Sequence, residues 1–156
     1  MPMIISTGNL SRGRELAAVL TAKGLHLRPM PDQALGTLTP GSVDVYVQLP
    51  LRDAPDQDAG MRSGLEEAAR FLRHGLLARF EAAVMVRDAL APNGLVVLVS
   101  GNTPRDGTPD SGSARSQLLA TLAEAIRSET ADRNIEVVIA PRTVTDEELL
   151  ALIQRR

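Results

Sequence analysis

The sequence is poor in the residue types on which several kinds of protein chemistry depend. Its 156 residues include no cysteine and no tryptophan, and aromatic residues make up only 2% of the chain. The absence of cysteine excludes disulfides, thiolate zinc sites and cysteine nucleophiles. So few aromatic rings also argue against a stacking surface for single-stranded nucleic acid. The two histidines, His26 and His74, are too few for a histidine-based metal site without carboxylate ligands.

Charge and hydropathy give no sign of a nucleic-acid or membrane partner. The formal net charge is −2, and the arginines are scattered among acidic residues, so that no basic stripe is available for a polyanion. No apolar run approaches the roughly 20 residues of a membrane helix. The N-terminus also lacks the basic region and long apolar stretch of a signal peptide. We therefore expect a cytoplasmic protein with one domain over residues 1–156.

Apolar runs alternate with helical spacings along the chain. We expect short strands and helices in turn, with strands at residues 3–6, 25–27, 43–47, 95–99 and 135–139 and helices at 15–23, 65–90 and 113–130 and from Thr145. Continuous apolar runs suit strands that are buried on both faces of a parallel sheet. The alternation predicts a shortened, Rossmann-like three-layer α/β sandwich with a mostly parallel sheet. We interpret residues 29–42 as loop, 51–63 as a mobile loop and 92–94 as a turn.

Several local signals add detail to this pattern. Gly24 suits the left-handed cap at the end of the first helix. Thr145 and Glu148 have the spacing of a capping box. In the long helical segment, Gly75 interrupts the pattern. The apolar side chains of that segment form one stripe, which should face the core: Leu65, Ala69, Leu72, Leu76, Phe80, Ala83, Val84 and Met85.

The second half of the chain has a strand ending in a serine, a helix and a second strand. It reads LVVLVSG, then a polar loop, then SARSQLLATLAEAIRSETADRNIEVVIAPRTVT. This order resembles the C-terminal half of the short-chain dehydrogenase/reductase family. In that family the strand-end serine works with a Tyr-x-x-x-Lys pair at the start of the helix. Here Gly112 and Ser116 stand at the tyrosine and lysine positions, and the only tyrosine and lysine are Tyr46 and Lys23. The resemblance therefore implies the scaffold of an oxidoreductase without its usual chemistry.

Three residues remain as candidates for a different chemistry. By the resemblance, the catalytic serine becomes Ser100, His74 lies near the position of the family's helix asparagine, and Arg115 lies beside the lost lysine position. Arg115 supplies charge but does not act as an acid, because a guanidinium does not deprotonate at ordinary pH. In the alternative interpretation, Ser100 is a strand-end turn residue without a base and His74 is a surface or interface residue.

The N-terminal segment IISTGNLSRGRELAAVLTAKG resembles the first strand, glycine-rich turn and helix of the same family. There, glycines let the backbone approach the pyrophosphate of a dinucleotide. Gly8, Arg12 and Gly13 match the motif if one residue is inserted, and Glu15 then takes the place of the third glycine. Arg28 follows the second strand, where the family often contacts a 2′-phosphate. The alternative is that the two glycines merely turn a strand into a helix. We expect no cofactor, or NADP(H) if any.

Two further differences from the family pattern indicate that the part of the fold that binds the dinucleotide is reduced in this chain. The family's Asn-Asn-Ala-Gly after the middle strand appears here as the residues QLPL, at positions 48–51. Too few residues separate Leu27 from Val43 for the usual helix, strand and helix. By the resemblance, we therefore expect that the strand beside the adenine is deleted in this chain.

The helices at 65–90 and 113–130 correspond to the family's common subunit interface and keep nearly their full length. Phe80, Leu77 and Leu119 are the candidate apolar anchors. The leading hypothesis is a non-catalytic member that forms homo-oligomers, or hetero-oligomers with an active relative. The second is a repurposed enzyme that performs proton chemistry or an unusual reduction at Ser100. The third is a nucleotide-sensing module that uses Arg12, Arg14 and Arg28 without catalysis.

Overall fold

Five parallel strands form the centre of the molecule. The computed structural model describes residues 1–50, 64–101 and 109–156, so the loop expected at 51–63 lies outside the described residues. The strands follow the order β2-β1-β3-β4-β5, and each neighbouring pair is parallel. Their bounds are β1 Ile4–Thr7, β2 Leu27–Pro29, β3 Val43–Gln48, β4 Leu90–Val99 and β5 Glu136–Ala140. The prediction of a Rossmann-like, parallel α/β domain is confirmed.

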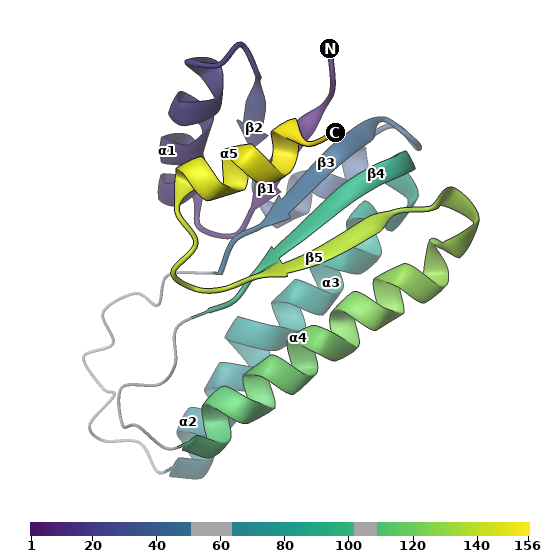
Figure 1. The fold of residues 1–156 in the computed structure, drawn as a ribbon. Coiled ribbons are helices and arrows are strands. Elements are labelled where there is room, and N and C mark those ends of the chain that lie inside the picture. The colour runs from purple at the N-terminus through teal and green to yellow at the C-terminus, as the bar shows by residue number, and fades with distance from the viewer. Residues whose placement is uncertain (51–63, 102–108) are drawn as a thin grey trace.

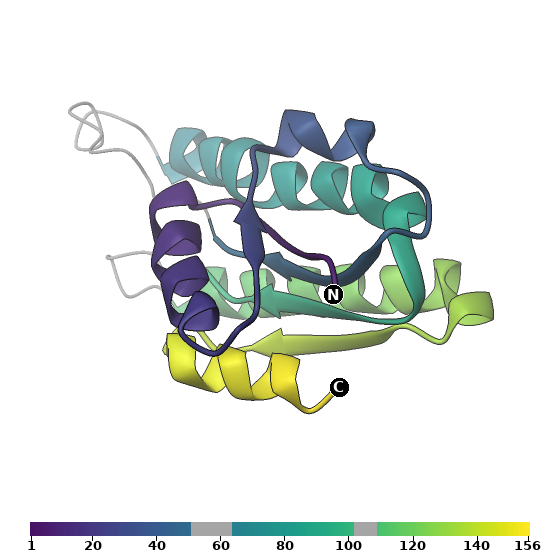
Figure 2. The same cartoon turned by 90° about the horizontal axis from the view of Figure 1, so that it is seen from above.

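Helices cover both faces of this sheet (Figures 1 and 2). On one face lie α1 (Leu10–Thr21) and α5 (Asp146–Gln154), whose apolar side chains pack on β1, β3 and β4. On the other face lie the 3-10 helix η1 (Asp32–Thr37), the α3 helix (Ala78–Val86) and the α4 helix (Pro109–Glu129). The strands β3 and β4 are buried on both faces, which explains their uninterrupted apolar sequences.

The first helix begins earlier than its apolar spacing suggested. It starts at Leu10, not at Glu15, because the Asn9 side chain accepts a hydrogen bond of 3.1 Å from the backbone nitrogen of Arg12 and so caps the helix. The expected loop at 29–42 is also corrected. It contains the end of β2, which starts two residues later than predicted, and the helix η1. Gly24 has the predicted left-handed conformation, with φ of +76°.

The turn expected at residues 92–94 lies inside β4. Val43 pairs with Leu90 and Val45 with Leu95, so Asp44 alone stands opposite four residues of β4. Asn93 takes a φ of +59° in this irregular stretch. The prediction of a turn that precedes the strand is therefore wrong, and residues 91–94 form a bulge within β4.

The long helical segment is continuous but changes its winding. It runs through α2 (Gly64–Phe71), the π-helical segment η3 (Leu72–Leu77), α3 and the 3-10 turn η4 (Arg87–Ala89). The π-helical segment includes Gly75, the residue that interrupted the predicted pattern. The prediction that one apolar stripe faces the core is wrong at both ends of the stripe. Near the end of α3, Val84 is 61% exposed and Met85 is 39% exposed. Leu65 is 81% exposed and Leu72 is 50% exposed, because α2 extends beyond the carboxyl ends of the strands (Figure 1).

The C-terminal helix begins where the sequence predicted. The Thr145 hydroxyl accepts a hydrogen bond from the backbone nitrogen of Glu148 at 3.1 Å, and the Glu148 carboxylate accepts one from the backbone nitrogen of Thr145 at 2.8 Å. This reciprocal pair is the expected capping box. Among the helices of the described residues, none is long and apolar enough to cross a membrane.

Candidate functional site: the crevice between β1 and β3

The strands β1 and β3 are neighbours, but the described helices that follow them lie on opposite faces of the sheet. The chain passes from β1 into α1 on one face and from β3 towards α2 and α3 on the other. In α/β sheets such a switch point opens a crevice at the carboxyl ends of the strands, where ligands commonly bind. This crevice is therefore the candidate site. It is lined by Thr7, Gly8, Asp32, Gln48, Leu49, Ala78, Arg79 and Ala82.

The crevice is almost filled by the chain itself. The free space among its lining residues is about 10 Å³. On one side, the backbone nitrogen of Leu49 donates a 3.0 Å hydrogen bond to the carbonyl oxygen of Thr7. Gly8 follows with a φ of +92°, and a Cβ atom there would collide with the carbonyl oxygen of Leu49. Gly8 is therefore required by contact with the chain's own backbone, as well as by its positive φ.

Buried polar side chains occupy the floor of the crevice. The hydroxyl groups of Thr7 and Tyr46 lie 2.7 Å apart. The Gln48 amide nitrogen donates to the Tyr46 hydroxyl at 3.2 Å and to the backbone carbonyl of Arg79 at 2.9 Å. The Arg79 guanidinium donates through Nε to the Gln48 amide oxygen at 2.7 Å and through Nη2 to the Val99 carbonyl at 2.7 Å. We call Thr7, Tyr46, Gln48 and Arg79 the crevice network.

Burial controls the ionisation of the groups in and around this network. It raises the pKa of Tyr46 to about 12, and the hydrogen bonds from Thr7 and Gln48 lower it only in part. Burial also raises the pKa of Asp32, with a further contribution from the negative charge of Glu81. A fully buried phenol with so high a pKa stays protonated at neutral pH. Tyr46 is also fully buried and hydrogen-bonded to Thr7 and Gln48, so its hydroxyl group serves the packing of the crevice floor.

Of the four predicted cofactor residues, the structure places only Gly8 in the crevice. Gly13 lies in α1, where a Cβ atom would come within 2.9 Å of the Ser6 hydroxyl oxygen, so it serves close packing of helix and strand. Arg12 donates a 2.8 Å hydrogen bond to the carbonyl of Val144, just before α5. Arg28 is exposed on β2, at the edge of the sheet.

The three predicted catalytic residues are not brought together by any described contact. Ser100 is half-buried at the end of β4, where its backbone nitrogen donates to the Ala140 carbonyl at 2.9 Å. His74 belongs to η3 and Arg115 to α4, but their side chains lie outside the described part of the structure. Ser116, at the lysine position, is exposed in α4. Ser100 therefore remains a prediction without an observed base.

Sequence analysis missed the crevice network. The sequence nevertheless carried one signal for the Gln48 end of the network and one for the Arg79 end. Gln48 is a polar residue at the end of an apolar strand, two positions after Tyr46 and therefore on the same face. Arg79 has the helical spacing of Leu76 and Ala83, so a charged residue stood among buried positions.

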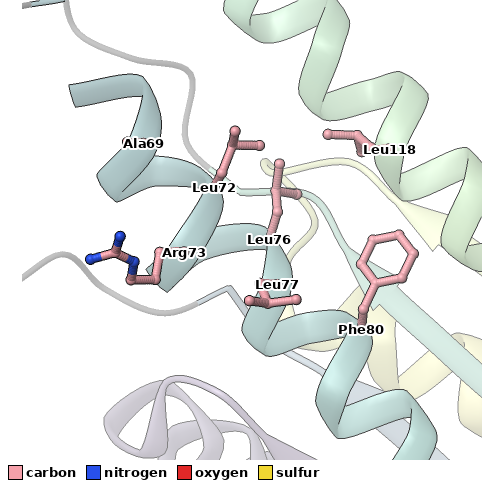
Figure 3. Close-up of a pocket in the computed structure, with 7 residues that line it drawn as sticks. All are labelled: Ala69, Leu72, Arg73, Leu76, Leu77, Phe80 and Leu118. Carbon is pink, nitrogen blue, oxygen red and sulfur yellow. The ribbon is translucent and has the colours of Figure 1, made fainter. Parts of the chain in front are cut away.

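A second, larger hollow lies between the helices on one face of the molecule. Its volume is about 490 Å³, and its lining is almost entirely apolar: Ala69, Leu72, Arg73, Leu76, Leu77, Phe80 and Leu118. Figure 3 shows Leu118 of α4 directed towards Leu72 and Leu76. We call these seven residues the helical groove. It contains Leu77 and Phe80, two of the three predicted anchors, whereas the third, Leu119, is buried in the core.

Comparison with known structures identifies the fold. The chain superposes on E. coli BdcA with a TM-score of 0.61 at 12% identity, covering 98% of this chain and 88% of BdcA. It superposes on a proposed short-chain dehydrogenase/reductase from Corynebacterium glutamicum with a TM-score of 0.60 at 15% identity, covering 97% and 89%. The fold is that of the short-chain dehydrogenases and reductases. The sequence itself matches no protein-family model and no curated protein.

A third structure with a similar fold is a complex with a dinucleotide. BdcA in complex with NADPH aligns with 99% of this chain at a TM-score of 0.57 and 10% identity. At such low identity the likeness concerns the fold alone. In the present chain, the described crevice residues leave about 10 Å³, whereas ligand pockets usually enclose some hundreds of Å³. The free space between the described lining residues is therefore far smaller than a dinucleotide.

Proposed function

We propose that this chain is a dehydrogenase-like protein without dehydrogenase chemistry, which acts by associating with a second copy of itself or with a full-length relative. The helical groove is the observation that carries this proposal. Its 490 Å³ are lined by six apolar residues and one arginine, in a place where no described segment of the chain covers them. Apolar hollows of this kind on a monomer surface mark interaction sites.

Two exposed leucines support the choice of this face. Leu72 and Leu77 are 50% and 52% exposed, and both line the groove. Exposed leucines are ordinary when they are scattered singly, but two that share one groove form a patch. Such a patch resembles the buried apolar centre of a protein interface. The spacing of Ala69, Leu72, Leu76 and Phe80 also suits an apolar ridge that meets another helix.

The residues at the family's catalytic positions support a function without dehydrogenase catalysis. Gly112 and Ser116 have neither a phenol nor an ammonium group, so they cannot supply the proton that reduction of a carbonyl requires. The closed crevice supports the absence of a resident NADP(H). We therefore expect no turnover of ketones or alcohols with NADPH or NADH, and no effect of Ser100→Ala on the background rate.

The proposal is tested by sedimentation velocity on wild-type protein and on Leu77→Glu. A charge in the groove should abolish association and leave the circular dichroism spectrum unchanged, because Leu77 is half-exposed. The matched control is Leu10→Glu, since Leu10 is 36% exposed on α1, across the sheet from the groove. Phe80→Glu is expected to destabilise the fold as well, because Phe80 also packs against the core.

Two results would contradict the proposal. The first is a wild-type protein that stays monomeric at high concentration and does not co-sediment with full-length short-chain dehydrogenases from its own organism. The second is equal association of wild-type protein and Leu77→Glu, which would place any interface elsewhere.

A further inference from the structure

The side chain of Arg79 lines the crevice between β1 and β3 and links the strands around it. Arg79 is 7% exposed and enters the crevice from α3. It reaches β4 through the Val99 carbonyl at 2.7 Å and β3 through the Gln48 side chain at 2.7 Å. Its Nη2 also lies 3.4 Å from the Gln48 carbonyl oxygen. One guanidinium thus connects two strands and a helix at the carboxyl edge of the sheet.

The partners of Arg79 explain why an arginine suits this position. Gln48 and Val99 are the last residues of β3 and β4, and their carbonyl groups stand at the carboxyl ends of these strands. Buried carbonyl oxygens at such ends need a donor. A guanidinium offers five N–H groups in a fixed planar arrangement and can therefore serve several acceptors at once. Neither an apolar residue nor a single ammonium group would satisfy the same set.

The network extends from Arg79 to the first strand. Gln48 accepts from Arg79 and donates to Tyr46, whose hydroxyl lies 2.7 Å from that of Thr7. The ends of β1, β3 and β4 are therefore linked through side chains, with α3 holding the set. All four side chains are buried, and a buried polar network in which each member has a partner is rigid.

We propose that Arg79 is an internal lock, which keeps the switch-point crevice shut and occupies the place that the fold offers to a dinucleotide. The crevice is in this view a part of the core, and the protein keeps it closed in its working form. The lock is independent of the helical groove, because no member of the crevice network lines that groove.

Tyr46 gives a direct readout of the lock. It is the only tyrosine, and the chain has no tryptophan, so tyrosine emission reports on the crevice floor alone. The experiment measures acrylamide quenching of this emission in wild-type protein, Arg79→Met and Arg133→Met. Arg133 is the matched control, since its Nη1 binds the carbonyls of Arg87 and Leu90, at 2.7 and 2.9 Å, near the start of β4.

We expect weak quenching in wild-type protein, several-fold stronger quenching in Arg79→Met, and wild-type quenching in folded Arg133→Met. Equal quenching in Arg79→Met and wild type would overturn the lock, as would free quenching of wild-type Tyr46. If Arg79→Met does not fold, Arg79→Lys replaces it, because lysine keeps the positive charge but lacks the planar set of N–H donors of a guanidinium. Quenching should then rise to a lesser extent.

A ligand measurement completes the test. NADPH at millimolar concentration should leave the midpoint of thermal unfolding of wild-type protein unchanged. An NADPH-dependent increase of this midpoint would overturn the lock. Sedimentation of the same Arg79 variants separates this inference from the proposed association: a failed lock leaves association intact, and a failed association leaves the quenching result intact.

Discussion

The hydroxyl groups of Thr7 and Tyr46 lie 2.7 Å apart in the buried floor of the crevice, although 39 positions separate these residues in sequence. Thr7 ends β1 and Tyr46 belongs to β3, and the two strands pair directly. The Tyr46 hydroxyl also receives the Gln48 amide at 3.2 Å. This hydroxyl therefore joins two partners that have no access to water.

Removal of this hydroxyl should destabilise the protein. Tyr46→Phe leaves the Thr7 hydroxyl and one N–H of Gln48 short of a partner in a buried place. We expect a decrease of about 1–2 kcal/mol in the free energy of unfolding, measured by urea denaturation. Thr7→Ser is the control, because it keeps a hydroxyl at position 7 and should cost less. A Tyr46→Phe variant as stable as the wild type would show that the bond contributes nothing net.

The raised pKa of Tyr46 also predicts how stability depends on pH. The pKa is about 12 in the folded chain and about 10 in the unfolded chain. Between these values the folded state holds a proton that the unfolded state has lost. The protonated Tyr46 therefore contributes its full share to the free energy of unfolding below pH 10. This share is lost as the pH rises towards 12, and the total loss approaches about 3 kcal/mol.

The measurement is urea denaturation at several pH values between 9 and 12, with Tyr46→Phe as the reference. This variant lacks the titrating group but keeps all the arginines and Lys23, so the difference between the two curves isolates Tyr46. Parallel curves for wild type and variant would contradict the prediction.

The sequence predicted those parts of the fold that local patterns determine. The second half of β4 and most of β5 were predicted correctly because their apolar runs are continuous, although β5 lies at the sheet edge and its Ile139 is 40% exposed. The capping box of Thr145 and Glu148 was found because its partners are three residues apart. The start of α1 was missed because a side-chain cap, and not the apolar spacing, sets it.

The crevice network was beyond such patterns. Apart from the bond between Gln48 and Tyr46, its bonds join residues that are 20 to 39 positions apart, and the identity of these partners depends on strand order and helix placement. A lone charged residue on a buried helix face indicates that something unusual lies opposite, but it does not say what. The same holds for the apolar stripe of α2, since its exposure follows from the helix extending past the sheet.

Two glycines with positive φ provide a paired test of the closed crevice. Gly8 and Gly24 have φ of +92° and +76°. A Cβ atom at position 8 would collide with the Leu49 carbonyl, whereas position 24 has no atom within 4 Å. Gly24→Ala should cost about 1 kcal/mol, the price of the left-handed backbone alone. Gly8→Ala should cost about 3–5 kcal/mol, because the crowding is added to the strain.

Chemical denaturation of both variants decides the matter. Equal destabilisation would mean that Leu49 withdraws easily and that the crevice opens at little cost. A larger loss in Gly8→Ala would support a crevice whose wall is fixed by the Leu49–Thr7 backbone hydrogen bond.

The capping box of α5 gives the last prediction. Leu149, Leu150 and Ile153 of this helix are buried against α1 and the sheet, so fraying at its first turn exposes part of that core. Thr145→Ala removes the side-chain acceptor for the Glu148 nitrogen and should lower the free energy of unfolding by about 1 kcal/mol. Thr145→Ser keeps the acceptor and should lie close to wild type in urea denaturation. If both variants lose the same stability, the methyl group of Thr145 matters more than its hydroxyl, and the hydrogen-bond explanation fails.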